Sequence, residues 1–174
     1  HGRRLGEVGA MCYRGSDRST GHGKVGIAHD ETTHVIGGRN VMIAVGSTSK
    51  VPPLPGIEEV RIWTNREATL ARELPKSLVV LGGGPTGCEL AQVYVRFGVP
   101  TTIVQSGPRL APTDHPRNAE VIRAALERDG VTVRLGVRAN RARAGAGKDG
   151  AHGIELDDGS SDQGPRIRLA AGGA

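Results

Sequence analysis

The chain has 174 residues, enough for one domain or two small ones, and no apolar run approaches the roughly 20 residues that cross a bilayer. Its formal net charge is +5, but aromatic residues make up only 2%, which leaves few rings to stack on nucleic-acid bases. The arginines are mostly scattered singly, apart from a group formed by Arg134, Arg138, Arg141 and Arg143. Composition therefore argues against a membrane-spanning protein and against a nucleic-acid-binding one.

The cysteines and histidines form no recognisable ligand pattern. Cys12 and Cys88 lie far apart in the sequence, and neither belongs to a Cys-x-x-Cys motif. His22, His29 and His34 lie near one another, without carboxylate or thiol partners at metal-ligand spacing. The charged N-terminus has no apolar stretch behind it, so a secretory signal is not expected. We expect a cytoplasmic protein with no metal site, and the absence of an initiator Met suggests a segment of a longer reading frame.

The first third of the chain contains short apolar runs separated by turn residues. Residues 24–28, 33–36 and 40–45 are predicted as three strands of a small antiparallel meander, with Gly37-Gly38 in a turn. Three prolines then fall within residues 51–56 and favour an extended segment. This segment is the best candidate for a passage between two domains.

Strands and helices alternate after this passage. Thr64 and Glu67 form a capping box at the start of a short helix. The elements that follow are a strand over 77–81, a helix over 85–97, a strand over 101–104, a helix over 116–128 and a strand over 131–135. Short strands over 138–144, 153–156 and 167–170 come last. The order predicts an α/β domain with a parallel sheet and an appended antiparallel meander.

The helix over 85–97 has an apolar face at the spacing i, i+3, i+4 and i+7. The residues on that face are Leu90, Val93, Tyr94 and Phe97. Pro85 suits the first helical turn, and Gly98 suits the position after the helix end. We expect this face to pack against the sheet.

A glycine motif, Gly82-Gly83-Gly84-Pro85-Thr86-Gly87, joins the strand over 77–81 to this helix. Gly82-x-Gly84-x-x-Gly87 after a strand and before a helix, within a unit of roughly 30 residues, is typical of a Rossmann dinucleotide site. Gly82 would make the tight turn, Gly84 would let a pyrophosphate approach, and Gly87 would let the helix pack on the strand. Backbone N–H groups near Thr86 and Gly87 would bind the phosphates. The alternative is a purely structural strand–turn–helix.

The end of the next strand indicates which nucleotide would bind. An NAD-preferring unit places Asp or Glu there, whereas this chain has Gln105 and Ser106. Gln105 does not repel a 2′-phosphate, and Arg109 in the same loop could pair with one. The alternative for Arg109 is simple exposure to solvent. These residues favour NADPH slightly over NADH.

Several segments together resemble the pyridine nucleotide-disulfide oxidoreductases, especially the dihydrolipoamide dehydrogenases and mercuric reductases. The segments that carry the resemblance are residues 43–47, 52–56, 64–68, 74–91 and 108–112. The resemblance implies a nucleotide domain inserted into an FAD domain. Residues 1–56 would then be the end of the first FAD-binding segment with its crossing, 57–165 the NAD(P)-binding Rossmann domain, and 166–174 the start of the return to the FAD domain.

The resemblance also assigns residues to the cofactors. Ala44, Gly46 and Ser47 would line the FAD, although Val45 replaces the usual Thr of that segment. Glu89 matches the acidic residue of the glycine-loop helix, close to the nicotinamide. The redox cysteine pair, the FAD-binding glycine motif and the catalytic His of the family lie outside this sequence. No catalytic residue is therefore carried over, and we expect the segment alone to be inactive.

The implied parent is an FAD-dependent NAD(P)H oxidoreductase, homodimeric and concerned with redox homeostasis. In such an enzyme, hydride passes from NAD(P)H to FAD and electrons then reach a disulfide or a metal-ion acceptor. Two alternatives stay open at this point. One is a non-catalytic dinucleotide-binding fragment, and the other is a flavoprotein without a disulfide, such as a transhydrogenase-like enzyme.

Overall fold

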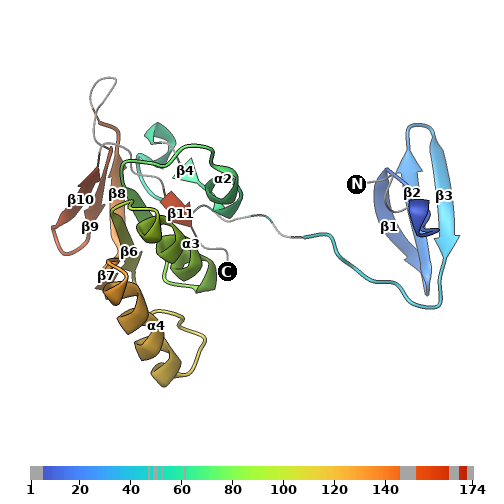
Figure 1. Ribbon diagram of the computed structural model, residues 1–174. Helices are drawn as coiled ribbons and strands as arrows, with labels where there is room; N and C mark the ends of the chain where they lie inside the picture. Colours follow the sequence, from blue (N-terminus) through green and yellow to red (C-terminus); the bar gives the residue numbers. More distant parts are fainter. Residues whose placement is uncertain are drawn as a thin grey trace. The chain divides into compact units, whose positions relative to one another are not determined.

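The computed structural model describes residues 6–46, 48, 51, 53–60, 62–145, 152–164 and 169–171. The chain divides into two compact units, His1–Gly46 and Ser47–Ala174, both drawn in Figure 1. Among the described residues, no helix is long and apolar enough to cross a bilayer.

The first unit is an antiparallel sheet of three strands in the order β1-β2-β3. The strands are β1 (Ser16–Gly21), β2 (Lys24–His29) and β3 (Thr32–Gly37). The meander predicted from the sequence is confirmed for the first two of its three predicted strands, which correspond to β2 and β3. β1 was missed because its sequence, SDRSTG, is almost wholly polar and all six residues are exposed. Pairing with β2 defines this strand, since no apolar run marks it.

The strand expected over residues 40–45 is absent. Residues 41–46, all of them described, follow β3 without regular secondary structure. Met42 is 91% exposed and Ile43 is 80% exposed. An apolar run becomes a strand when a neighbouring strand pairs with its backbone, and the strands described in this unit pair only with one another.

The second unit is built on a parallel sheet of five strands in the order β4-β11-β5-β6-β7. Its strands are β4 (Ile62–Trp63), β5 (Leu78–Leu81), β6 (Thr101–Gln105), β7 (Thr132–Leu135) and β11 (Leu169–Ala171). Its helices are η1 (Ile57–Glu59), α2 (Asn65–Leu70), α3 (Pro85–Arg96) and α4 (Pro116–Arg128). The succession β5-α3-β6-α4-β7 confirms the predicted α/β order.

A second sheet, antiparallel, follows the parallel one in the sequence. It consists of β8 (Ala139–Arg143), β9 (His152–Leu156) and β10 (Ser161–Gly164), in the order β10-β9-β8. The strands predicted over 138–144 and 153–156 correspond to β8 and β9. The appended antiparallel meander is therefore confirmed for these two strands, whereas its third strand, β10, was not predicted from the sequence.

The two faces of the parallel sheet are covered by different layers (Figure 1). On the helical side, the core contains Leu78, Val80, Ala91, Ile103 and Leu126. On the other side, strand residues pack against the antiparallel sheet through Val79, Leu81, Val104, Ile154 and Leu156. Because β5 is buried on both faces, it reads in the sequence as a continuous apolar run rather than an alternating one.

The last strand corrects the sequence prediction. A strand was expected over 167–170 among the antiparallel strands, but β11 lies in the parallel sheet, between β4 and β5. Residues 165–168 lie outside the described residues. A three-residue strand carries no local signal of its direction or its neighbours, so its place depends on long-range pairing.

Helix α3 buries only part of the face expected: Tyr94 is buried as predicted, but the buried face is otherwise a different one. Its buried residues are Gly87, Cys88, Ala91 and Tyr94, whereas Val93 is 48% exposed and Phe97 is 66% exposed. Leu90 is half-buried at the edge of the core. The periodicity argument favoured the large apolar side chains, but a helix that lies close to β5 needs small residues at the contact.

The proline-rich segment is held against the second unit. Leu54 is buried in the core, and the N–H of Ala142 donates to the carbonyl of Pro55 at 2.8 Å. Gly56 has φ 77°, and a Cβ there would lie 2.2 Å from the carbonyl oxygen of Ala142. Only glycine suits this conformation and this approach. The passage between the two units therefore lies before Leu54.

Helix α2 begins with the capping box that the sequence predicts. The N–H of Arg66 donates to Thr64 Oγ1 at 3.3 Å, and the N–H of Thr64 donates to Glu67 Oε2 at 2.8 Å. The Thr64 hydroxyl also donates to Glu67 Oε2. This hydrogen bond first, and the one from the Thr64 backbone second, lower the pKa of the Glu67 carboxyl. The capping pair fixes where the chain enters the helix after β4.

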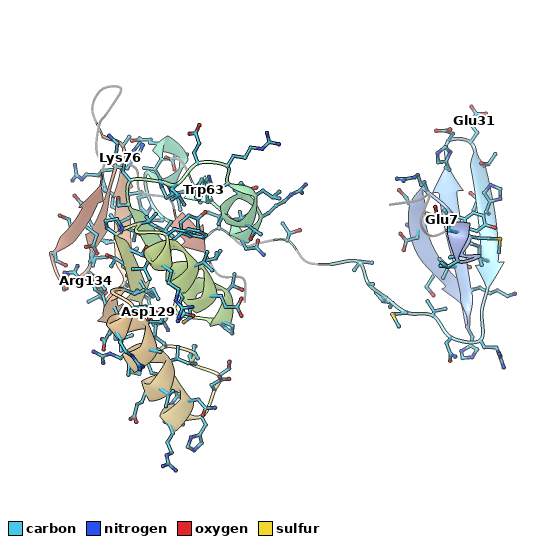
Figure 2. All side chains as sticks on the ribbon, in the orientation of Figure 1. Glu7, Glu31, Trp63, Lys76, Asp129 and Arg134 are labelled. Atoms are coloured by element: carbon cyan, nitrogen blue, oxygen red, sulfur yellow. The ribbon has the colours of Figure 1, made fainter. Side chains whose placement is uncertain are left out.

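Two of the four arginines that cluster in the sequence, Arg134 and Arg143, make ion pairs with residues of the antiparallel sheet. Arg134 in β7, labelled in Figure 2, donates to Ser160 Oγ at 2.8 Å and to Asp162 Oδ2 at 3.3 Å, which joins the parallel sheet to the antiparallel one. Arg143 in β8 pairs with Glu155 in β9. These two arginines are therefore engaged by neighbouring strands.

Asp129, just after α4, ties this helix to α3 (Figure 2). Its Oδ2 accepts from Gln92 Nε2 at 2.8 Å and from Arg96 Nε at 2.9 Å. The hydrogen bond from Gln92, followed by the bond from Arg96, lowers the pKa of the Asp129 carboxyl. A carboxyl with a lowered pKa contributes stability above the ordinary carboxyl range and loses it as the pH falls through its folded-state pKa.

We therefore expect the Asp129→Asn variant to melt below the unaltered chain at neutral pH. The gap between the two melting temperatures should narrow as the pH falls below the ordinary carboxyl range, because both chains then lack the charge. Thermal melts across this acidic range measure the gap. Glu127→Gln is the matched control, since its exposed pair with Arg123 at 2.8 Å should contribute little at any pH. A gap that does not change with pH would contradict the inference that the charge of Asp129 stabilises the fold.

Candidate functional site

The glycine motif lies where the sequence predicted, between β5 and α3. Gly82 has φ 103°, a left-handed backbone that favours glycine, and its N–H donates to the carbonyl of Val104 at 2.8 Å. Because β5 and β6 are parallel, with Leu81 opposite Val104, their carboxyl ends meet at one edge of the sheet. In open α/β sheets, ligands bind at this edge.

The second and third motif glycines differ in the space around them. A Cβ at Gly87 would lie 2.3 Å from the carbonyl oxygen of Gly82 and 3.2 Å from Val80 Cγ1. At Gly84, no heavy atom lies within 4 Å of the same position. Gly87 therefore allows α3 to approach β5, and Gly84 leaves an open side on the loop.

The start of α3 offers unsatisfied backbone donors at this open side. Gly84 is the N-cap of α3 and provides no side-chain cap, and Pro85 has no N–H to donate. The next N–H groups, those of Thr86 and Gly87, lie in the first helical turn, where intrahelical acceptors are lacking. The helix dipole adds partial positive charge at the same point. This end of α3 suits a phosphate group.

Gly83 lies between Gly82 and Gly84, and both its N–H and its carbonyl make hydrogen bonds. Its N–H donates to Gln105 Oε1 at 2.8 Å, and its carbonyl accepts from the N–H of Ala111 at 2.7 Å. The Cys88 thiol also donates to this carbonyl, at 3.5 Å. A Cβ at Gly83 would lie 2.4 Å from Leu110 Cδ2. Sequence reasoning did not find these contacts, although the shared strand edge places Gln105 beside the loop.

The residues predicted near the ribose lie on the loop after β6. Gln105 is half-buried and bonded to Gly83, while Ser106 is exposed. Arg109 is half-buried and donates from Nη2 to the carbonyl of Pro112 at 2.8 Å. The structure therefore brings these predicted residues and the glycine loop to the same edge of the sheet.

Glu89 is exposed on α3 and borders a hollow of about 270 Å³ between α3 and α4. Pro85 and Cys88 line the same hollow. Burial, followed by the charge of Glu89, raises the pKa of the Cys88 thiol. A buried thiol with a raised pKa is a poor nucleophile, which agrees with the inference that Cys88 is no redox cysteine.

The residues assigned to FAD lie apart from the glycine loop in the chain. Ala44 and Gly46 are exposed and belong to the first unit, where Gly46 has φ 73°. Ser47 lies outside the described residues. The structure thus brings the nucleotide-side residues together, whereas Ala44 and Gly46 belong to the first unit.

The described part of the chain holds no group of three or more His, Cys, Asp or Glu side chains placed to bind a metal ion. Its two cysteines, Cys12 and Cys88, are free thiols. The groups that the described residues offer at the site are backbone N–H donors, the Arg109 guanidinium, the Gln105 amide, the Ser106 hydroxyl and the Glu89 carboxylate.

Comparison with known proteins gives the family. The model of the pyridine nucleotide-disulphide oxidoreductases matches residues 9–173. The chain is 35% identical over 164 residues to dihydrolipoyl dehydrogenase 3 of Pseudomonas aeruginosa, covering 92% of this chain and 32% of that protein. It is 36% identical over 105 residues to the mercuric reductase of Shewanella putrefaciens, covering 60% of this chain and 19% of that protein.

A solved structure shares the fold. The HOCl-induced flavoprotein disulfide reductase RclA of Escherichia coli matches with a TM-score of 0.68 and 23% identity, over 91% of this chain and 35% of that chain. The chain thus spans about a fifth to a third of the length of the relatives it matches. On the extent of the family match and the identity to its members, this chain belongs to the pyridine nucleotide-disulphide oxidoreductase family.

Proposed function

We propose that this chain is the nicotinamide-nucleotide-binding part of an FAD-dependent NAD(P)H oxidoreductase. The observation that carries the proposal is the open side of Gly84 at the unsatisfied start of α3. The backbone can approach a pyrophosphate there, and the N–H groups of Thr86 and Gly87 can bind it. A turn with only a structural role would need no such open side.

The residues of this chain bind and orient the dinucleotide. The glycine loop holds the pyrophosphate, the loop after β6 receives the adenosine ribose, and Glu89 lies on the helix that faces the nicotinamide end. When both cofactors are bound, NAD(P)H supplies a hydride to FAD, and electrons then pass to a disulfide or a metal-ion acceptor. Ala44, Gly46 and Ser47 would contribute to the flavin side.

The loop after β6 favours NADPH over NADH. Residues 105–112 contain no Asp or Glu, so no carboxylate on this loop repels a 2′-phosphate. Arg109 keeps further N–H donors besides the one bonded to Pro112, and a guanidinium pairs well with phosphate oxygens. Both features suit a 2′-phosphorylated dinucleotide.

The final acceptor differs between relatives, whose names include dihydrolipoyl dehydrogenase and mercuric reductase. The proposal therefore names the hydride donor and the flavin, and leaves a disulfide or metal ion as the acceptor class. We also propose that the parent protein is a homodimer and is cytoplasmic.

Titration of the 174-residue chain with NADPH and NADH tests the nucleotide role, with nucleotide fluorescence as the readout. We expect both to bind, NADPH more tightly. If neither binds, the site assignment is wrong. Hydride transfer is tested separately, by mixing NADPH with the longest protein that contains this chain and following the loss of flavin absorbance. Binding without flavin reduction would support the alternative of a non-catalytic dinucleotide module.

A further inference from the structure

The peptide that joins Gly83 to Gly84 is held at its carbonyl end. The Gly83 carbonyl accepts two hydrogen bonds, from the N–H of Ala111 at 2.7 Å and from the Cys88 thiol at 3.5 Å. Ala111 is 2% exposed and Cys88 is 8% exposed, so both donors belong to buried residues. The carbonyl therefore points into the interior of the second unit.

The N–H of Gly84 belongs to the same peptide. None of the described peptide bonds is cis, and in a planar trans peptide the C=O and N–H bonds point in opposite directions. Because the Gly83 carbonyl points inward, the N–H of Gly84 points outward. No acceptor for this N–H is found among the described residues, and no heavy atom lies within 4 Å of a Cβ added at Gly84.

The two preceding N–H groups of the glycine motif already have acceptors. The N–H of Gly82 donates to the carbonyl of Val104 at 2.8 Å. The N–H of Gly83 donates to Gln105 Oε1, also at 2.8 Å. The Gly84 N–H is therefore the first donor of the motif that is left for a ligand, and its direction depends on how the Gly83 carbonyl is held.

The backbone donor to this carbonyl is itself held in an unusual conformation. Ala111 has φ 43°, in the left-handed region that residues other than glycine rarely adopt. Leu110, just before it, is 1% exposed, and its Cδ2 lies 2.4 Å from where a Cβ of Gly83 would be. Such a conformation persists where the surrounding contacts determine it. Since the Ala111 donor is main chain, Cys88 is the side chain whose substitution can probe this arrangement.

We propose that Cys88 is a positioning residue of the dinucleotide site. Together with the N–H of Ala111, its thiol keeps the Gly83 carbonyl turned inward, and the rigid peptide then presents the N–H of Gly84 to a phosphate oxygen. The thiol itself touches no ligand and takes no part in electron transfer. This inference rests on the proposed function, because it presumes that a dinucleotide binds at the glycine loop.

Two substitutions of Cys88 separate the hydrogen bond from the packing of the side chain. Cys88→Ala removes the donor. Cys88→Ser places a hydroxyl, a better donor than a thiol, at nearly the same position. The matched control is Cys12→Ala, which removes the exposed thiol of the first unit.

The first measurement is the dissociation constant of NADPH for the 174-residue chain and these three variants, each kept well below its melting temperature. We expect Cys88→Ala to bind NADPH about threefold more weakly, since a thiol is a weak donor and the Ala111 bond remains. We expect Cys88→Ser and Cys12→Ala to bind it as the unaltered chain does. A merely structural role of the sulfur would not be rescued by serine.

The second measurement is hydrogen exchange of the glycine amides, followed by nuclear magnetic resonance with and without NADPH. An N–H without an acceptor exchanges readily, whereas a bonded one is protected. We expect the Gly84 amide to exchange freely in the chain alone and to slow at least about tenfold with saturating NADPH. The Gly83 amide, bonded to Gln105, should be protected in both states.

The outcomes distinguish this inference from the proposed function. If the unaltered chain does not bind NADPH, the proposed function is wrong and this inference with it. If the chain binds NADPH and Cys88→Ala binds it equally well, or Cys88→Ser binds it as weakly as Cys88→Ala, the positioning role is wrong while the proposed function stands. Protection of the Gly84 amide without nucleotide would show that its N–H does not point outward.

Discussion

The Gly84→Val variant should lose at least about a hundredfold in affinity for NAD(P)H while its fold stays intact. The backbone of Gly84, at φ −73° and ψ 177°, is one that any residue adopts, and the space beside it is open. A valine there fits the folded chain but fills the approach to the N–H groups at the start of α3. Two hydrogen bonds to a charged phosphate, each contributing about 1.5–3 kcal/mol, would be lost.

Nucleotide titration and a thermal melt of the same sample measure the two parts of this expectation. Valine is a poorer N-cap than glycine, so a destabilisation of about 1 kcal/mol or less is expected. Gly37→Ala in β3, where an added Cβ meets no heavy atom within 4 Å, is the control for a glycine change remote from the loop. Unchanged NADPH affinity in Gly84→Val would contradict the assignment of the pyrophosphate to this site.

Gly87→Val should instead destabilise the fold itself, lowering the free energy of unfolding by about 3 kcal/mol. Its Cβ would lie 2.3 Å from the carbonyl oxygen of Gly82, and backbone cannot move aside as a flexible side chain can. Overpacking in a close-packed interior costs about 1–3 kcal/mol, and a clash with main chain belongs at the upper end. Helix α3 would have to move away from β5 to admit the side chain.

Urea unfolding gives the free energy of unfolding of this variant, with Gly84→Val as the matched control in the same motif. The midpoint of Gly87→Val should fall well below that of Gly84→Val. Equal midpoints for the two variants would show that α3 does not lie as close to β5 as described.

The sequence was most informative where one local pattern determined the structure. The apolar run Leu78–Leu81 and the glycine spacing predicted a buried parallel strand, a turn and a helix, and the structure has all three. The same spacing predicted that Gly87 would allow close packing, and a Cβ added at Gly87 would indeed lie only 2.3 Å from the carbonyl oxygen of Gly82. These features depend on residues within a few positions of each other.

Features that depend on distant residues could not be predicted in this way. The bond between Gly83 and Gln105 joins two strand ends that are adjacent only in the folded sheet. The exposure of Phe97 likewise depends on how closely the small residues of α3 approach β5. The periodicity of apolar residues gives no information about this distance. In the first unit, β1 is a strand because β2 pairs with it, and its own sequence gives no apolar signal.

The place of β11 has a consequence for the order in which the sheet can assemble during synthesis. β4 pairs with β11 and with no other described strand, and β11 also pairs with β5. While the ribosome makes the chain from its N-terminus, β5, β6 and β7 can pair as soon as each emerges. β4 must wait, without a neighbour on the sheet, until Leu169–Ala171 has left the exit tunnel. The carboxyl ends of β5 and β6, which carry the glycine loop, can therefore form early. The outermost strand, β4, pairs last.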